Sequence, residues 1–147
     1  MRLTIYAKKK VAHAMFRKGT HFLAAAVLLH QKDGYRDVVL HLLCQGLEIV
    51  QKGLLLASDY DKFRPKLKTP LGHDLVRGSD ALHAAYALKP LKKRTRAELQ
   101  LLSNYYCKNV LRYGTNHDLL VGTEHLQFEA VMRKSAALTV FGNKIFR

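Results

Sequence analysis

Apolar residues recur every three or four positions in the first third of the chain. In residues 11–31 they are Met15, Phe22, Ala25, Ala26 and Leu29. In residues 35–58 they are Val39, Leu43, Leu47, Val50 and Leu54. Side chains at this spacing share one face of an α-helix. Because Lys32, Asp33 and Gly34 form a turn signal between the two segments, the pattern predicts two antiparallel helices joined as a hairpin.

A broken, basic segment follows the predicted hairpin. Residues 59–71 contain Pro65 and Pro70, and proline removes a backbone hydrogen-bond donor from a helix. We therefore expect a loop there. Beyond it, the spacing of apolar residues predicts three more helices, over residues 72–88, 95–113 and 123–141.

Capping signals predict the ends of the last two helices. Thr95 and Glu98 have the spacing of a capping box, in which each side chain accepts a hydrogen bond from a backbone amide at the helix start. Thr123 is expected to cap the last helix in a similar way. Gly114 and Gly142 are expected to end these two helices, because glycine readily leaves the helical conformation.

These elements predict an all-α protein, a single-domain bundle of about five helices over residues 11–141. The chain has 147 residues, of which 48% are hydrophobic, and this is enough for one continuous core. Residues 1–10 include three consecutive lysines, and we expect them to form a flexible basic arm. Residues 142–147 are expected to form a short tail.

The chain is strongly basic. It holds 25 Lys and Arg residues against 11 Asp and Glu residues, which gives a formal net charge of +14. A surplus of this size favours polyanionic partners such as RNA, DNA or an anionic membrane. The basic residues expected to contact nucleic acid precede the third and fourth predicted helices: Lys62, Arg64, Lys66, Lys68, Lys92, Lys93, Arg94 and Arg96.

Membrane insertion, secretion and metal binding are not predicted. The longest unbroken apolar run, residues 22–29, is eight residues long, whereas a membrane span needs about 20. Residues 1–10 lack the apolar centre of a signal peptide, so a cytoplasmic location is expected. Cys44 and Cys107 are isolated from one another and predict neither a disulfide framework nor a zinc cluster. We expect both to be small core residues.

A polar stripe runs along the second predicted helix. Its members are His41, Gln45, Glu48 and Lys52. Their spacings of four, three and four residues place them on one helix face. The simplest interpretation is a surface ion pair between Glu48 and Lys52 with solvated neighbours.

Candidate catalytic chemistry lies at the end of the fourth predicted helix, where Arg112 is followed by His117. A histidine can act as general base or acid on a ribose hydroxyl while a guanidinium stabilises charge on the phosphate, and RNA cleavage by this route needs no metal ion. The spacing alone is not specific, because composition predicts roughly 1.6 chance matches. The sequence holds two further pairs, Arg36 with His41 and Arg77 with His83.

Three motifs resemble those of the HEPN superfamily of small helical domains, in the same order. Residues 43–56 resemble its Gln-x-x-Glu-x-x-x-Lys-x-x-Leu signature, with Gln45, Glu48 and Lys52 at the polar positions. The sequence Gly-His-Asp-Leu at residues 72–75 is similar to the opening of its third helix. Leu-Arg-Tyr-Gly at residues 111–114 resembles the Arg-Tyr-Pro that ends its fourth. The resemblance covers roughly residues 12–141 and implies the up-and-down helical arrangement of that family.

This resemblance selects one of the three arginine–histidine pairs. In catalytic members of the family, an Arg-x4–6-His motif at this place cuts RNA without metal, usually in a homodimer that brings two motifs into one cleft. Many members are toxins paired with a nucleotidyltransferase antitoxin. The resemblance therefore implies that Arg112 and His117 are catalytic, without a cofactor. Asn116 is a candidate for orienting the substrate or the histidine.

A non-catalytic function is the alternative. Tyr113 stands where active members of the family often carry a polar residue, and Gly114 replaces the proline of the Arg-Tyr-Pro variant. Other members have lost the motif and only bind. The alternative is therefore a helical dimer that binds nucleic acid, or a protein-interaction module whose surplus charge is a solvated face.

Overall fold

The computed structural model describes residues 2–108, 111 and 122–147. Within these residues the chain forms helices and no strand. The elements are α1 (Ile5–Gln31), α2 (Arg36–Ser58), α3 (Tyr60–Phe63), the 3₁₀ turn η1 (Arg64–Lys66), α4 (Leu75–Ala85), α5 (Lys93–Cys107) and α7 (Glu129–Ile145). The predicted all-α bundle is therefore confirmed for the described part of the chain.

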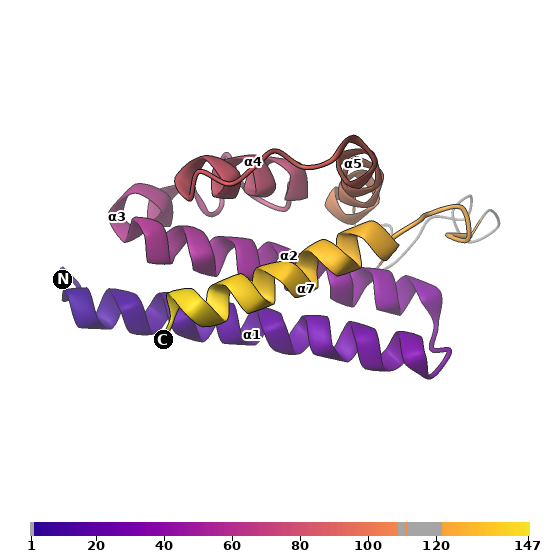
Figure 1. The fold of residues 1–147 in the computed structure, drawn as a ribbon, viewed down its shortest axis with the longest axis horizontal. Coiled ribbons are helices and arrows are strands. Elements are labelled where there is room, and N and C mark those ends of the chain that lie inside the picture. The colour runs from indigo at the N-terminus through magenta and orange to yellow at the C-terminus, as the bar shows by residue number, and fades with distance from the viewer. Residues whose placement is uncertain (1, 109–110, 112–121) are drawn as a thin grey trace.

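The hairpin of α1 and α2 forms the base of the bundle, as the hydrophobic pattern predicted (Figure 1). α7 crosses this hairpin on one side, whereas α3, α4 and α5 cover α2 on another, with α5 seen nearly end-on (Figure 1). The helix α2 therefore contacts both groups and supplies much of the core. Its fully buried leucines are Leu40, Leu43, Leu47, Leu54 and Leu55.

Glycines allow α1 and α2 to approach each other closely. A Cβ atom on Gly19 would lie 2.7 Å from the backbone nitrogen of Val50, and one on Gly53 would lie 2.7 Å from that of Phe16. Both distances are shorter than van der Waals contact, and backbone atoms cannot rotate away. An isolated glycine costs a helix about 1 kcal/mol relative to alanine. Here the packing of two helix backbones against each other offsets that cost.

The first helix begins earlier than the sequence predicted. Thr4 is its N-cap, and the hydroxyl of Thr4 accepts a hydrogen bond from the amide of Ala7 at 3.1 Å. Lys8 then donates to Asp61 of α3 at 2.6 Å. The predicted flexible arm is therefore wrong for residues 5–10, which form the first turns of α1 and contact α3.

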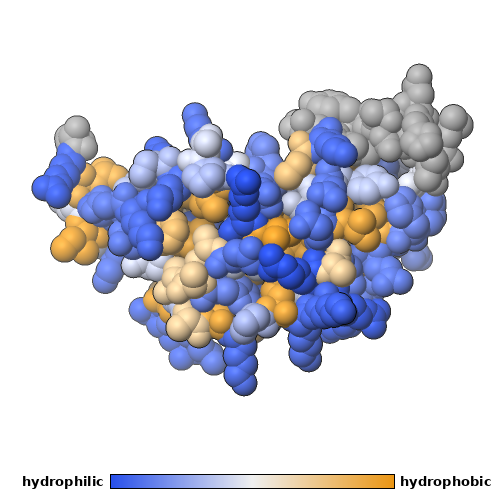
Figure 2. Space-filling view, turned by 90° about the horizontal axis from the view of Figure 1, so that it is seen from above, coloured by the Kyte–Doolittle hydropathy of each residue, from blue (hydrophilic) through white to orange (hydrophobic). Residues whose placement is uncertain are grey.

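The segment between α2 and α4 is also more ordered than a loop. Asp59 caps α3 by accepting a hydrogen bond from the amide of Lys62 at 3.0 Å. Phe63, Leu67 and Leu71 are buried in the core. These three apolar residues hold the segment against the bundle, while the basic residues between them face solvent. Seen from this side, hydrophilic side chains cover most of the surface (Figure 2).

Two predicted caps are wrong because their side chains bind elsewhere. α5 begins at Lys93, and Glu98 instead accepts hydrogen bonds from the amides of Ala130 and Val131 at 2.8 and 3.1 Å. Glu98 of α5 thus caps the start of α7, a helix about 30 residues later in the sequence. Thr123 does not cap α7 either, because that helix begins at Glu129.

The predicted end of the last helix is also wrong, because α7 continues through Gly142 to Ile145. A Cβ at Gly142 would overlap the ring of Phe16 in α1. This glycine is therefore a packing site that leaves room for an aromatic ring, and α7 does not stop there.

By length and composition α2 could cross a membrane, but 67% of its most apolar window is buried inside the protein. The core helix of a soluble protein passes the same test. The apolar composition of α2 follows from its place between the two groups of helices.

We expect Gly53→Ala to lower the free energy of unfolding by about 2 kcal/mol, because the added methyl group forces the α1 and α2 backbones apart. Chemical denaturation measures this. Ala25→Ser adds one atom to the exposed face of α1 and should change stability by less than about 0.5 kcal/mol. Equal stability of Gly53→Ala and the wild type would contradict the close approach of the two helices.

Candidate functional site

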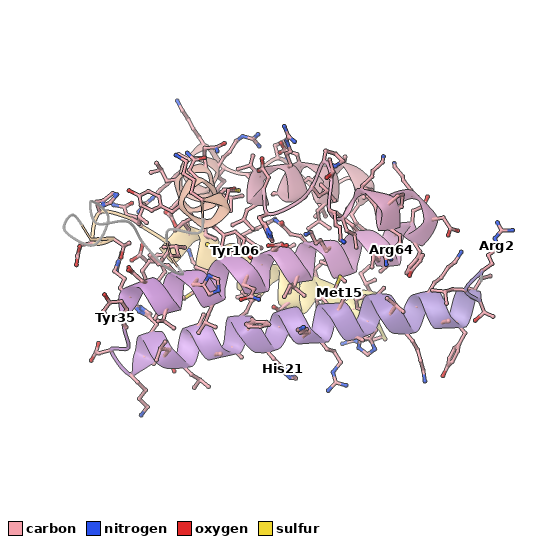
Figure 3. All side chains as sticks on the ribbon, turned by 180° about the vertical axis from the view of Figure 1, so that it is seen from behind. Arg2, Met15, His21, Tyr35, Arg64 and Tyr106 are labelled. Carbon is pink, nitrogen blue, oxygen red and sulfur yellow. The ribbon has the colours of Figure 1, made fainter. Side chains whose placement is uncertain are left out.

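A cluster of polar side chains joins α2, α5 and the turn that precedes α4. Its centre is the carboxylate of Glu48, whose side chain is 12% exposed. Lys52 donates to Glu48 Oε1 at 2.6 Å, and Tyr106 of α5 donates to Glu48 Oε2. His73 Nδ1 lies 3.0 Å from the same Oε2. We call these four residues the Glu48 cluster; Tyr106 lies between α5 and α2 (Figure 3).

The Glu48 cluster is more buried than the surface ion pair that the sequence predicted. Burial raises the pKa of Glu48, but the hydrogen bonds from Lys52, Tyr106 and His73 outweigh it and hold the pKa below its ordinary value. The carboxylate is therefore ionised at neutral pH. Burial and the hydrogen bond to this carboxylate both raise the pKa of Tyr106, so its hydroxyl keeps its proton.

The ionised carboxylate fixes the orientation of His73. A carboxylate only accepts hydrogen bonds, so Nδ1 of His73 carries the proton and donates it. In the neutral ring this leaves Nε2 as a proton acceptor. The side chain of His73 is 67% exposed. An exposed imidazole held by a buried carboxylate is an arrangement suited to general base chemistry.

The turn of residues 72–75 is held by side chains from both neighbouring helices. From α2, Lys52 donates to the carbonyl of Gly72 at 2.6 Å. From α5, Cys107 Sγ donates to the carbonyl of His73 at 3.2 Å, and the hydroxyl of Ser103 accepts from the amide of Leu75 at 3.0 Å. Residues 103, 106 and 107 share one face of α5. The C-terminal end of α5 is thereby fixed against this turn.

The predicted catalytic residues follow this fixed end in the sequence. Arg112, Asn116 and His117 all lie in residues 112–121, outside the part of the chain that the structure describes. The expectation that Arg112 and His117 come together therefore stays a prediction. Leu111, directly before Arg112 in the sequence, is buried.

The chain on the far side of residues 112–121 is anchored to the start of α2. Arg36 donates from Nε to the carbonyl of Thr123 at 3.1 Å and also to the carbonyl of Leu126. The hydroxyl of Thr123 donates to Asp37. Since Asp37 and Glu48 are separated by eleven residues of helix, the two anchoring points lie about 17 Å apart along α2.

In the other two arginine–histidine pairs, structural contacts are made by Arg36, Arg77 and His83. Arg36 stacks on the ring of Phe128, 4.8 Å from its centroid, in addition to its backbone contacts. Arg77 donates to the carbonyl of Pro70 at 3.2 Å, whereas His83 Nδ1 donates to the carbonyl of Lys89 at 2.7 Å. These contacts direct Arg77 and His83 to opposite ends of α4. The Arg77–His83 pair therefore lacks the arrangement of a phosphate-cleaving site.

The eight basic residues predicted to contact nucleic acid are all exposed and lie in two groups. Lys62, Arg64, Lys66 and Lys68 lie in α3, η1 and the following turn, whereas Lys92, Lys93, Arg94 and Arg96 lie at the start of α5. Arg96 is neutralised by Asp80 through hydrogen bonds of 2.7 and 3.1 Å. The other charges remain available to a partner, and no bound nucleic acid tests this prediction.

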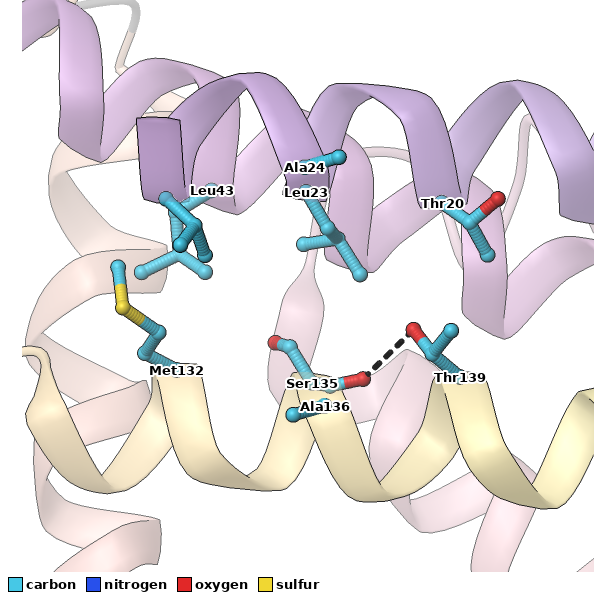
Figure 4. A pocket seen from close by; sticks show the side chains of 9 residues that line it. Thr20, Leu23, Ala24, Leu43, Met132, Ser135, Ala136 and Thr139 are labelled. Carbon is cyan, nitrogen blue, oxygen red and sulfur yellow. Dashed lines mark hydrogen bonds between the residues drawn. The ribbon is translucent and has the colours of Figure 1, made fainter. Parts of the chain in front are cut away.

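An apolar pocket between α1 and α7 has a volume of about 250 Å³ (Figure 4). Its lining includes Leu43, Ala24, Met132 and Ala136, and it contains no charged residue. The hydroxyl of Thr139 in its wall already donates to a backbone carbonyl of α7 at 3.0 Å. This pocket lacks the groups needed for acid–base or phosphate chemistry.

Sequence reasoning missed the parts of the site that depend on tertiary contact. Tyr106 stands at helical spacing from the apolar residues Leu99 and Leu102, which gives no sign that its hydroxyl donates to Glu48, 58 positions earlier. Cys44 is buried, as expected, and burial raises the pKa of its thiol. Cys107 is exposed, and the expectation that it is a core residue is wrong. The described residues hold no group of three or more candidate metal ligands.

Comparison with known proteins adds no family assignment. No protein-family model, curated protein or solved structure matches the chain. The function of the site is therefore inferred from its residues and geometry.

Replacing the central carboxylate tests the Glu48 cluster. We expect Glu48→Gln to lower the free energy of unfolding by about 3 kcal/mol at pH 7, because Lys52 loses its charged partner in a half-buried site. Since the folded pKa of Glu48 lies below its ordinary value of 4.5, its stabilisation is present above that pH. It is lost as pH falls through the folded pKa, so the difference between wild type and variant should shrink below pH 4.5.

The matched control is Asp80→Asn, which removes the exposed ion pair with Arg96. Its effect on stability should be much smaller, because solvent screens exposed charges. Urea denaturation between pH 3 and 7 measures both variants. Equal losses at pH 7 would show that the Glu48 cluster has no special role in the fold.

Proposed function

We propose that the chain is a HEPN-like protein that acts on RNA as a metal-independent endoribonuclease. His117 serves as general base and acid, Arg112 stabilises charge on the phosphate, and Asn116 orients the substrate or the histidine. One observation carries this proposal. Segments far apart in the sequence that resemble HEPN motifs meet in the Glu48 cluster.

The meeting of these segments supports a common role for them. Glu48 and Lys52 come from the first motif, and His73 comes from the second. Tyr106 belongs to α5, the helix that precedes the third motif in the sequence. Tyr106 donates to Glu48 and Cys107 donates to the carbonyl of His73, so the end of α5 is held five residues before Arg112 in the sequence. A precisely held helix end is what a catalytic segment following it requires.

The proposed reaction is transfer of the phosphoryl group to the neighbouring ribose hydroxyl. His117 accepts the proton of the 2′-hydroxyl, and the 2′-oxygen attacks phosphorus. The bond from phosphorus to the 5′-oxygen breaks, and His117, now protonated, returns the proton to that leaving oxygen as general acid. The guanidinium of Arg112 stabilises the negative charge that develops on the phosphate oxygens. The products are a 2′,3′-cyclic phosphate and a 5′-hydroxyl end.

We expect the purified protein to cleave RNA in the presence of EDTA and to leave a 2′,3′-cyclic phosphate. His117→Ala and Arg112→Ala should each reduce the cleavage rate by at least about 100-fold, because each removes a group that acts in the transition state. Gel assays and mass spectrometry of the fragments measure the rate and the end chemistry.

His21→Ala is the matched control, because His21 is exposed on α1 and belongs to none of the three motifs (Figure 3). It should cleave at the wild-type rate. His73→Ala is assayed in parallel, since His73 also has the geometry of a base. If His73→Ala abolishes cleavage and His117→Ala does not, the base assigned here is wrong.

The two groups of exposed cations favour a second candidate function, RNA binding without cleavage. Such binding should weaken steeply as salt increases, because each neutralised phosphate releases counterions. Binding with this salt dependence and without strand scission would replace the catalytic proposal. Absence of RNA and DNA binding at physiological salt would favour a protein-interaction module.

The proposed partners follow from the same family resemblance. We propose a homodimer in which two Arg112–His117 segments share one cleft, acting in the cytoplasm as a toxin restrained by a nucleotidyltransferase antitoxin. Light scattering on the purified protein tests the dimer. A monomer at the concentrations used for cleavage would remove the shared cleft from the proposal.

A further inference from the structure

A second pocket lies between α4, the start of α5 and the first two turns of α7. Its volume is about 390 Å³. Five of the nine residues that line it are basic in type, and none is acidic. These are His83, Lys89, Lys92, Arg133 and Lys134. Of these, the sequence singled out Lys92 as a nucleic-acid contact and His83 as a member of one arginine–histidine pair.

The cations of this pocket have no partners among the described residues. Lys89, Lys92, Arg133 and Lys134 form none of the ion pairs or side-chain hydrogen bonds found within residues 2–108, 111 and 122–147. Burial lowers the pKa of Lys134. Burial and the positive charge of Lys134 lower the pKa of His83. Positive groups are thus gathered here at an energetic cost that an anion between them would offset.

Two carboxylates on the helices that form this pocket, Asp80 of α4 and Glu98 of α5, are already engaged. Asp80 forms its ion pair with Arg96. Glu98 lies behind the pocket residue Ala130, where its Oε1 accepts from the amides of Ala130 and Val131. Neither carboxylate is in contact with the lysines, so the pocket keeps its positive charge.

The start of α5 adds to the attraction for an anion. Lys92 is its N-cap and makes no side-chain capping bond, and the first turn holds no acidic residue. The first amides of a helix lack partners within it and carry partial positive charge. Thr95, in that first turn, lines the pocket. The cations and the helix start therefore act on the same space.

The wall of the pocket is fixed in place. His83 Nδ1 donates to the carbonyl of Lys89 at 2.7 Å, and the amide of Leu88 donates to the carbonyl of His83 at 2.9 Å. These bonds hold the segment between α4 and α5 against the end of α4. Binding would therefore require little ordering of the backbone.

We propose that this pocket binds a phosphate monoester, carried either by the 5′ end of an RNA strand or by a free nucleotide. Four lysine and arginine side chains and a helix start match a dianion better than the single charge of a carboxylate or a phosphodiester. Pro90 and Leu91 supply an apolar surface for the group attached to the phosphate. This inference does not rest on cleavage by Arg112 and His117.

The test compares two 2′-O-methyl oligoribonucleotides of one sequence, with a 5′-phosphate or a 5′-hydroxyl. They lack the 2′-hydroxyl nucleophile, so binding is measured without cleavage. Fluorescence anisotropy at physiological salt should show at least about 10-fold tighter binding of the phosphorylated strand by the wild type. In Lys134→Met and Lys92→Met this preference should fall toward one.

Lys18→Met is the matched control, because Lys18 is exposed on α1 and does not line the pocket. It should keep the preference for the phosphorylated strand. Lys134→Met should also unfold at the same or a higher temperature than the wild type, since it removes an unpaired, half-buried charge. A loss of preference at unchanged or raised stability separates phosphate binding from a structural role.

Calorimetry with adenosine 5′-monophosphate and adenosine distinguishes the two sources of the phosphate. If only the monophosphate binds, in a manner that depends on Lys134, while the two strands bind equally, the ligand is a free phosphate monoester. The proposal is overturned if the wild type discriminates within neither pair. It is also overturned if discrimination survives in both Lys134→Met and Lys92→Met.

Discussion

The carboxylate of Glu48 is the constraint on which the positions of α5 and of the turn before α4 depend. A buried anion must be compensated, and its compensation comes from α2, the turn before α4 and α5 together. Lys52 also holds the backbone of the turn before α4, because its amino group donates both to Glu48 and to the carbonyl of Gly72. Moving α5 or the turn alone would remove the hydrogen bond of Tyr106 or of His73 from this buried carboxylate. The two elements are therefore held in one arrangement relative to α2.

This constraint connects the fold to the proposed chemistry. The face of α5 formed by residues 103, 106 and 107 carries its hydrogen bonds at the end from which the chain continues toward Arg112. The next described anchor is Thr123, which is bonded to Arg36 and Asp37 at the start of α2. The described residues on both sides of 112–121 are thus tied to the same helix, α2, through Tyr106 and Thr123.

The periodicity of apolar residues predicted the helices, whereas it did not predict the side-chain contacts between residues that lie far apart in the sequence. The α1–α2 hairpin follows from apolar residues at helical spacing, and the chain order of the helices from the same pattern. Glu98 sits at capping-box spacing from Thr95, but the uncapped amides of α7 offer its carboxylate a buried site. Likewise the sequence predicted the polar stripe that contains Glu48. The burial of Glu48, however, depends on Tyr106, which lies 58 positions later in the sequence. Spacing alone cannot reveal such partners.

Most carboxylates of the chain are engaged in contacts within the fold, so few of them can neutralise the cations that make up the surplus charge of +14. Eight of the eleven acidic residues cap helices or hold elements together: Asp37, Glu48, Asp59, Asp61, Asp74, Asp80, Glu98 and Glu129. A carboxylate bound to backbone amides does little to neutralise lysines elsewhere. The cations near α7 therefore lack counter-charges within the described chain, and a phosphate would supply the charge that these carboxylates do not.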